Sequence, residues 1–394
     1  MKIVIDARWI FRELSGIGMY TQELLGQFAL LRGDDTFVAL FDNADVRHRV
    51  SVTAALDAAP HISTLDLRYG VFSPRNQLEL PGLLASLHAD VYHSPNYMVP
   101  LFPRLVRAGK PQHTAVVTTI HDLIPLVVPG HAPRSKKTRM LPVFRWVIRR
   151  AARVSDAIVT VSRCSRDDIV RCLRPRPPEK VHVVYNGVGT VFSPAPPGLT
   201  PRDPKRPRRL LYVGRADPYK DVATLVRALA ILRRDGGAPV ELLIAGPRDP
   251  RYPQAEQLAR GLGVADAIAW TGYLATDQLV SAYRDADVLV HASRYEGFGL
   301  QILEAMATGL PVVAARGGAV PEVAGDAALL LEPGDADGFA REIRRTLNAP
   351  ALAERMRRDG HAQAARFRWS TTAAETLAVY REAAAVRAKA RSPS

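Results

Sequence analysis

Cysteine is scarce in this sequence: Cys164 and Cys172 are the two cysteines among 394 residues. Two thiols cannot build a disulfide scaffold or a structural zinc site, and they are typical of a reducing compartment. No run of about 18 apolar residues occurs either, so we expect no membrane-spanning segment. The opening MKIVIDARWI carries Asp6 and Arg8 where a secretion signal needs an uninterrupted apolar stretch. We therefore expect a cytoplasmic protein.

Acidic residues are outnumbered by basic ones, 39 against 53, which gives a formal charge of +14. Such an excess favours anionic partners, namely nucleic acid, acidic lipid or a phosphorylated small molecule. An arginine-rich composition that reflects a GC-rich genome explains the charge equally well. Because the sequence shows neither interleaved aromatic residues nor a recognised nucleic-acid-binding module, we expect no nucleic-acid partner.

Short apolar runs, by contrast, are abundant. Apolar residues make up 47% of the chain, and the chain is too long for one typical core, so two domains are expected. The runs are mostly apolar throughout, which predicts parallel sheets covered by helices on both faces. The expected strands are Lys2–Asp6, Thr36–Leu40, Asp90–His93, Thr114–Ile120, Ala157–Val161, Lys180–Val184, Leu210–Gly214, Val240–Gly246, Ala267–Gly272, Asp287–Ser293, Pro311–Ala315 and Ala327–Pro333. The expected helices are Ile17–Leu31, Asp221–Arg234, Thr276–Arg284, Leu300–Thr308, Ala336–Leu347 and a terminal helical region.

A proline-rich segment separates the two halves. Residues 193–209 hold six prolines and almost no large apolar side chain, which predicts a linker. The predicted domains are two Rossmann-like α/β units over residues 1–192 and 210–368, with a terminal helix over residues 369–394 that crosses back to the first. Ligands of such sheets bind beyond the carboxyl ends of the strands, so we expect the two domains to face each other across one cleft.

Two glycines follow the first predicted strand, in the stretch SGIGMY. Gly16 and Gly18 stand just before a helical pattern, where backbone can approach a phosphate or a sugar closely. The stretch is not a dinucleotide-binding fingerprint, because Thr21 occupies the third glycine position. A structural turn explains the two glycines as well as a ligand loop does.

Polar residues follow two other strands of the first half. His121 and Asp122, in TTIHDLIP, come directly after an apolar strand, where packing gives no reason for a polar pair. A neutral histidine there could hydrogen-bond a substrate hydroxyl, and the alternative is a solvated loop. His93, in VYHSPNY, is a weaker parallel for which a structural role is favoured.

The second half begins with a strand and a basic turn, LYVGRADPYKD. Arg215 provides a planar fork and Lys220 a point charge near a helix start, a combination that suits a diphosphate. The alternative is an ordinary surface ion pair with Asp217 or Asp221.

Two glutamates flank a glycine-rich turn in SRYEGFGLQILEAMATG. Glu296 follows a predicted strand, and Gly297 and Gly299 form the turn. A helix is expected from Leu300, and the free amides at its start offer a phosphate site. Glu304 lies about one turn into that helix. Carboxylates accept strong hydrogen bonds from hydroxyl groups, so the pair suits a sugar joined to a nucleotide by a diphosphate.

With these motifs the sequence resembles the family 4 glycosyltransferases of GT-B fold. The resemblance lies in VGRADPYKD, in EGFGLQILEAMATGLPVVAARGGAVPEVAGDAALLLEP with its E-x7-E spacing, and in GIGMYTQELL, HDLIP, VTVSRCSRDDI and VYNGV of the first half. It implies retaining transfer from a nucleotide-diphospho-sugar, with no required cofactor or metal. The first-half patterns look most like bacterial mannosyltransferases of polysaccharide or lipopolysaccharide synthesis. They imply GDP-mannose or a GDP-deoxysugar as donor and a glycan or lipid-linked acceptor.

The resemblance also implies roles for single residues. Arg215 and Lys220 look like the diphosphate clamp, which stabilises the leaving group. Glu296 looks like the contact to donor-sugar hydroxyls, and Glu304 like the contact to the ribose. The other implied positions are the backbone amides of Gly297, Phe298, Gly299 and Leu300 for the sugar or phosphate, the cleft-lining loop at Gly16 and Gly18, and the active-site histidine at His121.

One departure from the family pattern is Gln301, where many members have proline. It should alter the helix start slightly and leave both acids in place. No residue is assigned as general base, because the acceptor hydroxyl itself is the implied nucleophile. The alternative functions are a nucleotide-sugar epimerase of the same fold and, more distantly, a non-enzymatic anion-binding protein.

Two DAD triplets, at residues 285–287 and 335–337, resemble the D-x-D pairs that bind divalent metals in another transferase fold. Here the first aspartate of 285–287 ends a predicted helix and the third opens a strand. Helix capping and solvation therefore explain them, and no metal site is expected.

The segment Arg134–Arg153 carries eight basic residues and no acid, together with the apolar Leu141, Phe144, Trp146 and Ile148. A helix of this composition could lie on an anionic membrane surface. The alternative is a packed helix with a basic face toward solvent. Peripheral contact with the inner face of a membrane would suit a lipid-linked acceptor.

Overall fold

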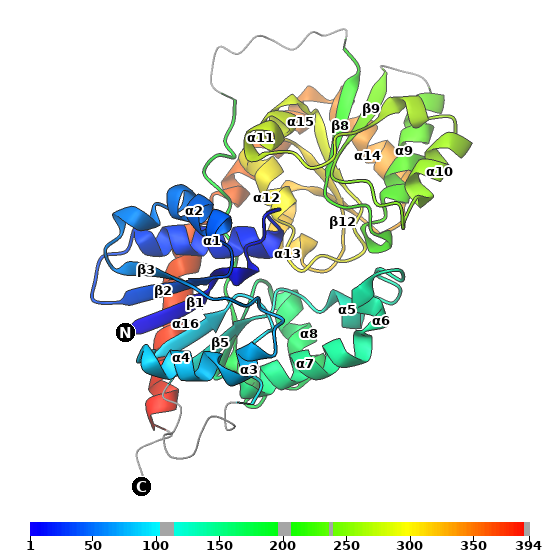
Figure 1. Cartoon of the computed structure of the whole chain (residues 1–394). Coiled ribbons are helices and arrows are strands. Elements are labelled where there is room, and N and C mark those ends of the chain that lie inside the picture. Colours follow the sequence, from blue (N-terminus) through cyan, green and yellow to red (C-terminus); the bar gives the residue numbers. More distant parts are fainter. Residues whose placement is uncertain (103–113, 196–205, 236–238, 390–394) are drawn as a thin grey trace. The chain divides into compact units, whose positions relative to one another are not determined.

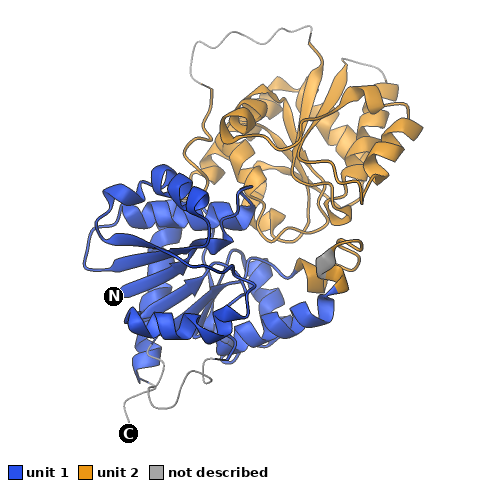
Figure 2. Ribbon diagram, in the orientation of Figure 1, with its two compact units in different colours: residues 1–123, 140–187, 369–394 blue, residues 124–139, 188–368 orange. Residues whose placement is uncertain are grey.

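The computed structural model describes residues 1–102, 114–195, 206–235 and 239–389 (Figure 1). The chain forms two compact units, which Figure 2 distinguishes by colour. Unit 1 comprises Met1–Leu123, Met140–Gly187 and Trp369–Ser394, and unit 2 comprises Ile124–Arg139 and Val188–Arg368. Each unit is built around its own parallel sheet, so the predicted α/β class is confirmed.

The sheet of unit 1 has seven strands in the order β3-β2-β1-β4-β5-β6-β7, and all its pairs are parallel. Its strands are β1 (Lys2–Asp6), β2 (Thr36–Phe41), β3 (Ile62–Asp66), β4 (Val91–Ser94), β5 (Ala115–Thr119), β6 (Ala157–Thr160) and β7 (Val181–Val183). The helices of this unit are α1 (Gly16–Ala29), α2 (Ala44–Thr53), α3 (Arg75–Leu78), α4 (Leu80–Ser86), α7 (Leu141–Val154), α8 (Arg163–Leu173) and α16 (Trp369–Lys389).

Strand β1 shows how the sheet of unit 1 buries both of its faces. Ile3 and Ile5 point to one face, where they join a core with α1, α2 and α16. Val4 points to the other face and packs in a second core with α4 and α7. Since successive side chains of a strand alternate between faces, an apolar run such as KIVI is what a doubly covered strand requires.

Unit 2 holds a parallel sheet of six strands in the order β10-β9-β8-β11-β12-β13. Its strands are β8 (Arg208–Val213), β9 (Val240–Ala245), β10 (Ile268–Trp270), β11 (Val288–His291), β12 (Val312–Ala315) and β13 (Leu329–Leu331). Its helices are α5 (Ile124–Val127), α6 (Lys136–Arg139), α9 (Val222–Arg234), α10 (Gln254–Gly261), α11 (Thr276–Asp285), α12 (Leu300–Ala307), α13 (Val320–Ala324), α14 (Ala336–Asn348) and α15 (Pro350–Ala364).

The helices of unit 2 also divide between two faces. Figure 1 shows α9, α10 and α14 gathered on one side of the sheet, where Tyr212 and Leu229 belong to their common core. On the other face α11, α12, α13 and the end of α15 pack together around Leu211 and Met306. The strand order reverses between β8 and β11, as it does between β1 and β4 in unit 1. Ligands of open α/β sheets bind beyond the carboxyl ends of the strands at such switch points.

The predicted strands are all present, with ends shifted by a residue or two, but β3 was not predicted. Its sequence, ISTLD, has polar residues at three of its five positions, and its side chains are half-buried or exposed. Strand β3 lies at the edge of the sheet, where one covered face is enough. A search for continuous apolar runs therefore passes over it.

The boundaries of the units differ from the predicted ones. Unit 2 begins at Val188, ahead of the expected linker at residues 193–209. Phe192 is the physical reason, because its side chain is 7% exposed and packs in the core of unit 2. Residues 196–205, most of the expected linker, lie outside the described residues. Residues 124–139 also group with unit 2, although they fall within the range expected for the first domain.

The basic segment Arg134–Arg153 forms two helices rather than one. Helix α6 ends at Arg139, and α7 begins at Leu141 with Pro142 in its first turn. Proline is tolerated in a first turn but not inside a helix, so the break falls here. None of the described helices is long and apolar enough to cross a membrane.

Candidate active site

The switch point of unit 2 brings a lysine and a glutamate together. Lys220 lies in the turn after β8, and Glu296 lies in the loop after β11. Because β8 and β11 are neighbours in the sheet, their carboxyl ends open onto the same place. The Lys220 ammonium donates hydrogen bonds to Glu296 Oε1 at 2.7 Å and to Oε2 at 2.9 Å.

Glu296 is an ionised group in a nearly dry position. Its residue is 6% exposed, and His291 Nε2, at the end of β11, lies 2.9 Å from Oε1. Burial alone would raise the pKa of Glu296, but the Lys220 charge and His291 outweigh it and hold the pKa well below its ordinary value. The carboxylate therefore stays charged at neutral pH and can accept hydrogen bonds.

The loop that carries Glu296 is locked by two glycines after β12. Glu296 and Gly318 form an isolated parallel bridge, in which Ala319 N donates to Glu296 O at 2.9 Å. A Cβ atom on Gly318 would lie 2.4 Å from Glu296 O, and one on Gly317 would lie 2.2 Å from Ser293 O. Gly318 also has φ +61, a conformation that favours glycine. No larger side chain fits at these two positions without moving the loop of residues 293–296.

The start of α12 lies between the two glutamates. Gly299 precedes the helix with φ +102, a left-handed conformation that lets the chain turn abruptly into Leu300. Phe298 is buried, and its ring meets that of Phe367 edge-on at 5.9 Å. Its side chain therefore anchors the turn in the core, and any ligand contact of Gly297 to Gly299 falls to the backbone.

Glu304 lies inside α12 and is 5% exposed. The Tyr283 hydroxyl, on α11, donates to Glu304 Oε2 at 2.6 Å. Burial raises the pKa of Glu304 to about 7, although the Tyr283 hydrogen bond opposes the shift. Unlike Glu296, this glutamate has no cation beside its carboxyl in the described contacts, and its charge changes near neutral pH.

Arg215 makes its ion pairs apart from the Lys220–Glu296 pair. Its Nε donates to Asp217 at 2.9 Å and its Nη2 to Asp249 at 3.1 Å. Asp249 lies in the loop after β9. The pair with Asp217 agrees with the alternative of an ordinary surface ion pair. The other partner considered there, Asp221, pairs instead with Arg294 at 3.1 Å.

In unit 1, His121 follows β5 and has a defined tautomer. Its Nε2 lies 2.9 Å from Pro95 O, and a carbonyl oxygen only accepts hydrogen bonds. Nε2 therefore carries the proton, and Nδ1 is the acceptor nitrogen of the neutral ring. Burial lowers the pKa of His121, although the Pro95 bond opposes this, so the neutral form prevails.

A buried chain of hydrogen bonds lies behind His121. Tyr380 Oη, on α16, is 2.5 Å from His93 Nδ1, and His93 Nε2 is 2.8 Å from Thr119 Oγ1. Thr119 Oγ1 is in turn 3.2 Å from Tyr20 Oη, and the Tyr20 ring meets the His121 ring edge-on at 4.9 Å. Burial lowers the pKa of His93 to about 3, so its ring is neutral. These contacts agree with a structural role for His93.

Gly16 and Gly18, expected just before a helix, lie in the first turn of α1 and differ in their surroundings. A Cβ atom on Gly16 would meet nothing within 4 Å, whereas one on Gly18 would lie 3.2 Å from Leu14 Cδ1. The amide of Gly18 donates to Ser15 Oγ at 3.2 Å, so Ser15 caps the helix. At Gly18 the contacts favour the structural interpretation of the loop.

One of the DAD aspartates caps a helix, as expected, whereas another is bonded to residues of β8 and is neither a cap nor fully solvated. Asp335 caps α14 by accepting from Gly338 N at 2.8 Å, and Asp287 accepts from Arg209 N at 2.8 Å. Among the residues that the structure describes, no group of three or more His, Cys, Asp or Glu side chains could hold a metal ion.

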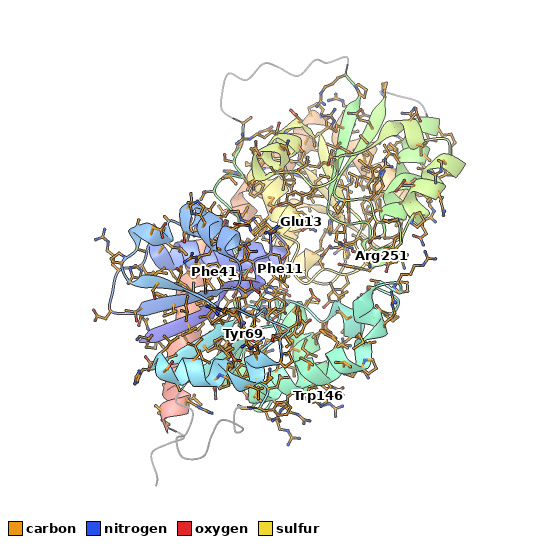
Figure 3. All side chains as sticks on the ribbon, viewed as in Figure 1. Phe11, Glu13, Phe41, Tyr69, Trp146 and Arg251 are labelled. Carbon is orange, nitrogen blue, oxygen red and sulfur yellow. The ribbon has the colours of Figure 1, made fainter. Side chains whose placement is uncertain are left out.

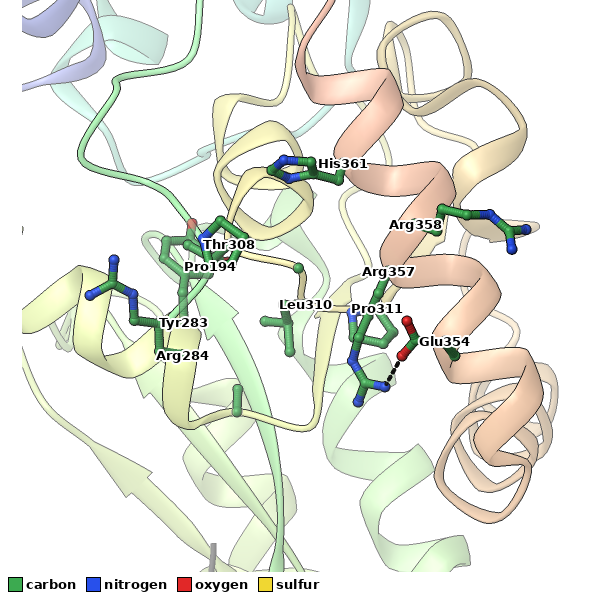
Figure 4. Close-up of a pocket in the computed structure, with 12 residues that line it drawn as sticks. Pro194, Tyr283, Arg284, Thr308, Leu310, Pro311, Glu354, Arg357, Arg358 and His361 are labelled. Carbon is green, nitrogen blue, oxygen red and sulfur yellow. Dashed lines mark hydrogen bonds and ion pairs between the residues drawn. The ribbon is translucent and has the colours of Figure 1, made fainter. Parts of the chain in front are cut away.

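A pocket of about 590 Å³ lies in unit 2 at the amino ends of the strands, opposite the end that carries the Lys220–Glu296 pair (Figure 4). Ala286 and Pro311 line it and precede β11 and β12, so the pocket opens at the amino ends of these strands. Arg357 in its wall is paired with Glu354 at 3.4 Å. The pocket is thus separate from the Lys220–Glu296 pair, which lies at the carboxyl ends.

Sequence reasoning missed three parts of this site. His291 lies in the run DVLVHAS and passed as part of a strand, although a histidine among buried aliphatic residues is itself a signal. The glycine pair of RGGAV, Gly317 and Gly318, directly follows β12 and marks a close backbone approach. Nothing in the sequence marks Tyr283, which approaches Glu304 through the packing of α11 on α12.

Two family models match the chain. The model of the glycosyl transferases group 1 matches residues 201–363, and that of glycosyltransferase family 4 matches residues 14–190. An MMP alpha-(1->4)-mannosyltransferase of Mycolicibacterium hassiacum is 32% identical over 306 residues, which are 75% of this chain and 71% of the relative. The O-antigen chain mannosyltransferase B of Escherichia coli is 28% identical and covers 97% of this chain and 100% of its own.

Solved structures agree at the level of the fold. The sucrose-phosphate synthase of Thermosynechococcus elongatus superposes with a TM-score of 0.76 at 22% identity, covering 98% of this chain and 100% of its own. The Anabaena protein HepE, solved with UDP and glucose, gives a TM-score of 0.71 at 18% identity, covering 96% of this chain and 99% of its own. The chain is a glycosyltransferase that belongs to family 4 and has the GT-B fold.

Proposed function

We propose that this enzyme moves a hexose, with retention of the anomeric configuration, from a nucleotide-diphospho-sugar to a hydroxyl group of a glycan or lipid-linked acceptor in surface polysaccharide synthesis. The proposed donor is GDP-mannose or a GDP-deoxysugar. The observation that carries the proposal is the Lys220–Glu296 pair at the switch point of unit 2, next to the start of α12. The names of the two mannosyltransferase relatives support the choice of sugar.

Lys220 and Arg215 are proposed to hold the diphosphate. A positive charge at the leaving phosphate stabilises the negative charge that develops when the glycosidic bond breaks. The backbone of Gly297 to Leu300 adds the amides of a helix start, which favour an anion. Arg215 would then exchange its bonds to Asp217 and Asp249 for bonds to phosphate oxygens.

The two glutamates are proposed to bind the groups on either side of the diphosphate. Glu296 stays ionised and would accept hydrogen bonds from the donor-sugar hydroxyls. Glu304 would accept from the ribose through Oε1, because Oε2 is bonded to Tyr283. His121, whose Nδ1 is an acceptor, is proposed to accept a hydrogen bond from a hydroxyl group of the bound sugar. Gly16 is proposed to line the same binding region of unit 1.

Peripheral membrane contact is proposed for α7. Phe144 and Ile148 are buried, but Val143 and Trp146 are 51% and 52% exposed, and Arg149 shares their exposed face. Figure 3 shows Trp146 at the surface of unit 1. Exposed apolar side chains beside arginines suit the surface of an anionic bilayer. Co-sedimentation with vesicles tests this, because binding that does not depend on anionic lipid or on Arg149 would contradict the proposal.

A thermal-shift screen with UDP, GDP, dTDP and ADP identifies the base, because a ligand that binds only the folded state raises the melting temperature. We expect GDP to give the largest shift, and a larger shift with UDP would overturn the choice of donor. Incubation with radiolabelled GDP-mannose and mannosylated acceptors then tests transfer. Conversion of the donor sugar without transfer would instead identify an epimerase.

A further inference from the structure

Unit 1 exposes two phenylalanines around a buried tryptophan. Phe11 is 45% exposed and Phe72 is 61% exposed, whereas Trp9 is 3% exposed. Trp9 meets Phe11 edge-on at 6.3 Å and Phe72 edge-on at 5.4 Å, and its ring lies 5.8 Å from that of Tyr97. We call Trp9, Phe11, Phe72 and Tyr97 the aromatic cluster.

The aromatic cluster lies beyond the carboxyl ends of the strands of unit 1, where ligands of open α/β sheets bind. Trp9 and Phe11 follow β1, Phe72 follows β3, and Tyr97 follows β4. Strands β1 and β4 flank the switch point of this sheet. Trp9 spans the two, since its Nε1 donates to Ser94 Oγ, at the end of β4, at 3.3 Å. Figure 3 labels Phe11 and Tyr69, which belong to the loops after β1 and β3.

Helix α2 holds the loop of Phe11 through side-chain hydrogen bonds to its backbone. Arg49 donates one hydrogen bond to Phe11 O and one to Arg12 O, both at 2.8 Å. Arg12 in turn pairs with Asp45 at 3.1 Å. Phe11 is therefore presented to solvent by a loop that has fixed backbone contacts.

The loop of Phe72 is held by hydrogen bonds from buried polar side chains. Asn76 is 4% exposed and donates to Gly70 O at 3.0 Å and to Val71 O at 2.6 Å. Arg8 donates to Tyr69 O at 3.1 Å and is itself 1% exposed, in a two-point ion pair with Asp6 at 2.7 and 2.8 Å. Burying polar side chains is costly unless they are bonded, so these contacts favour one loop conformation.

We propose that the aromatic cluster binds a pyranose ring of the acceptor glycan through Phe11 and Phe72. This rests on the proposed function. The face of an aromatic ring is electron-rich and attracts the polarised C–H groups on one face of a sugar. A lipid chain is a poorer occupant, because the exposed charged residues Arg12 and Glu13 follow Phe11 directly and interrupt the apolar surface. Such neighbours instead suit sugar hydroxyl groups. A preformed pair of rings also lowers the entropy lost on binding.

Binding of methyl α-mannoside, mannotriose and maltotriose, followed by saturation-transfer NMR, tests the proposal. We expect at least one saccharide to bind, and Phe11→Ala and Phe72→Ala each to weaken its binding by ~10-fold. Phe72→Trp should keep the affinity, whereas Phe72→Leu, which is apolar but has no ring, should lose it as Phe72→Ala does. Leu30→Ala, at another exposed apolar residue of unit 1, should change nothing; Leu30 is 73% exposed.

The same variants separate this proposal from the proposed function. In a transfer assay we expect Phe72→Ala to raise KM for the acceptor and to leave KM and hydrolysis of the donor unchanged. The proposal is overturned if no saccharide binds or if Phe72→Leu binds saccharide as well as the original chain does. It is also overturned if Phe72→Ala weakens binding to lipid vesicles but not binding to any saccharide. If saccharides bind through Phe11 and Phe72 but no nucleotide-sugar is turned over, the saccharide site stands and the transferase function fails.

Discussion

The Lys220 ammonium lies between the two oxygens of the Glu296 carboxylate, 2.7 Å from one and 2.9 Å from the other. Removing one partner of a buried ion pair leaves a charge without compensation, which costs about 3–5 kcal/mol. We expect Lys220→Met to destabilise unit 2 by an amount of this order and to raise the pKa of Glu296. Urea unfolding measures the stability.

Activity gives a second measure of the same pair. We expect Lys220→Met and Glu296→Gln each to lower kcat/KM by roughly 100-fold or more, the usual effect of losing one charge-stabilising group. The double variant should be more stable than Lys220→Met alone, because it leaves no unpaired carboxylate. Additive losses of stability in this cycle would show that the two side chains do not interact.

Glu304 predicts a dependence of stability on pH. Its pKa in the folded state, about 7, lies above the ordinary value of 4.5, so the folded state binds more protons between these values. The contribution of Glu304 to the free energy of unfolding is fully present below pH 4.5. It is lost as the pH rises towards 7, by ~1.4 kcal/mol per pH unit across that interval. Glu304→Gln should remove this loss, so its advantage over the original chain should grow with pH.

Unfolding in urea at pH 5 and pH 8 measures the effect of Glu304→Gln. Glu179→Gln, at an exposed residue just before β7, is the control and should give the same difference at both pH values. A Glu304→Gln variant whose relative stability does not change between pH 5 and pH 8 would contradict the raised pKa.

Gly318, after β12, and Gly334, after β13, allow a matched comparison. Gly318 and Gly334 both have positive φ, at +61 and +90, but a Cβ atom meets Glu296 O at 2.4 Å in the first and nothing within 4 Å in the second. Gly334→Ala should cost ~1–2 kcal/mol from backbone strain alone and leave kcat unchanged. Gly318→Ala should cost more and lower kcat, because the Glu296 loop must move. Equal kinetics in the two variants would contradict a positioning role for Gly318.

Tyr380 predicts a long-range effect of the last helix. Tyr380→Phe removes the hydrogen bond to His93 Nδ1 and leaves this fully buried nitrogen unpaired, which costs about 1–3 kcal/mol. Thermal unfolding measures this cost. Tyr273→Phe is the control, because Tyr273 is 61% exposed and its hydroxyl reaches water. A Tyr380→Phe variant as stable as Tyr273→Phe would show that the buried bond is unimportant.

Much of the fold was predictable because buried parallel strands are written as short apolar runs. Strand β3 was not, since an edge strand with one covered face needs fewer apolar residues. Pro142 marks the point at which Arg134–Arg153 divides into two helices. The sequence does not indicate that α6 belongs to unit 2 and α7 to unit 1. That assignment depends on which core each helix packs against, which local sequence does not record.

The site shows the same limit. Glu296, Glu304 and Lys220 could be singled out as polar groups near strand ends and a glycine turn. Their partners could not, because strand order decides that the loops after β8 and β11 meet. Asp249, which pairs with Arg215, follows a third strand of the same sheet. The exposure of Phe11 and Phe72 is likewise a property of the folded loops and has no signature in sequence.

Unit 2 is encoded almost entirely inside unit 1, because residues 188–368 separate Gly187 from Trp369. Trp369 and Tyr380 complete the core that covers one face of the first sheet. During translation the ribosome therefore finishes the whole of unit 2 before it supplies the helix that closes unit 1. The nascent chain must keep the apolar faces of β5 and β6 uncovered by α16 throughout that interval. Unit 2 is then the first part of the protein able to reach its complete folded state.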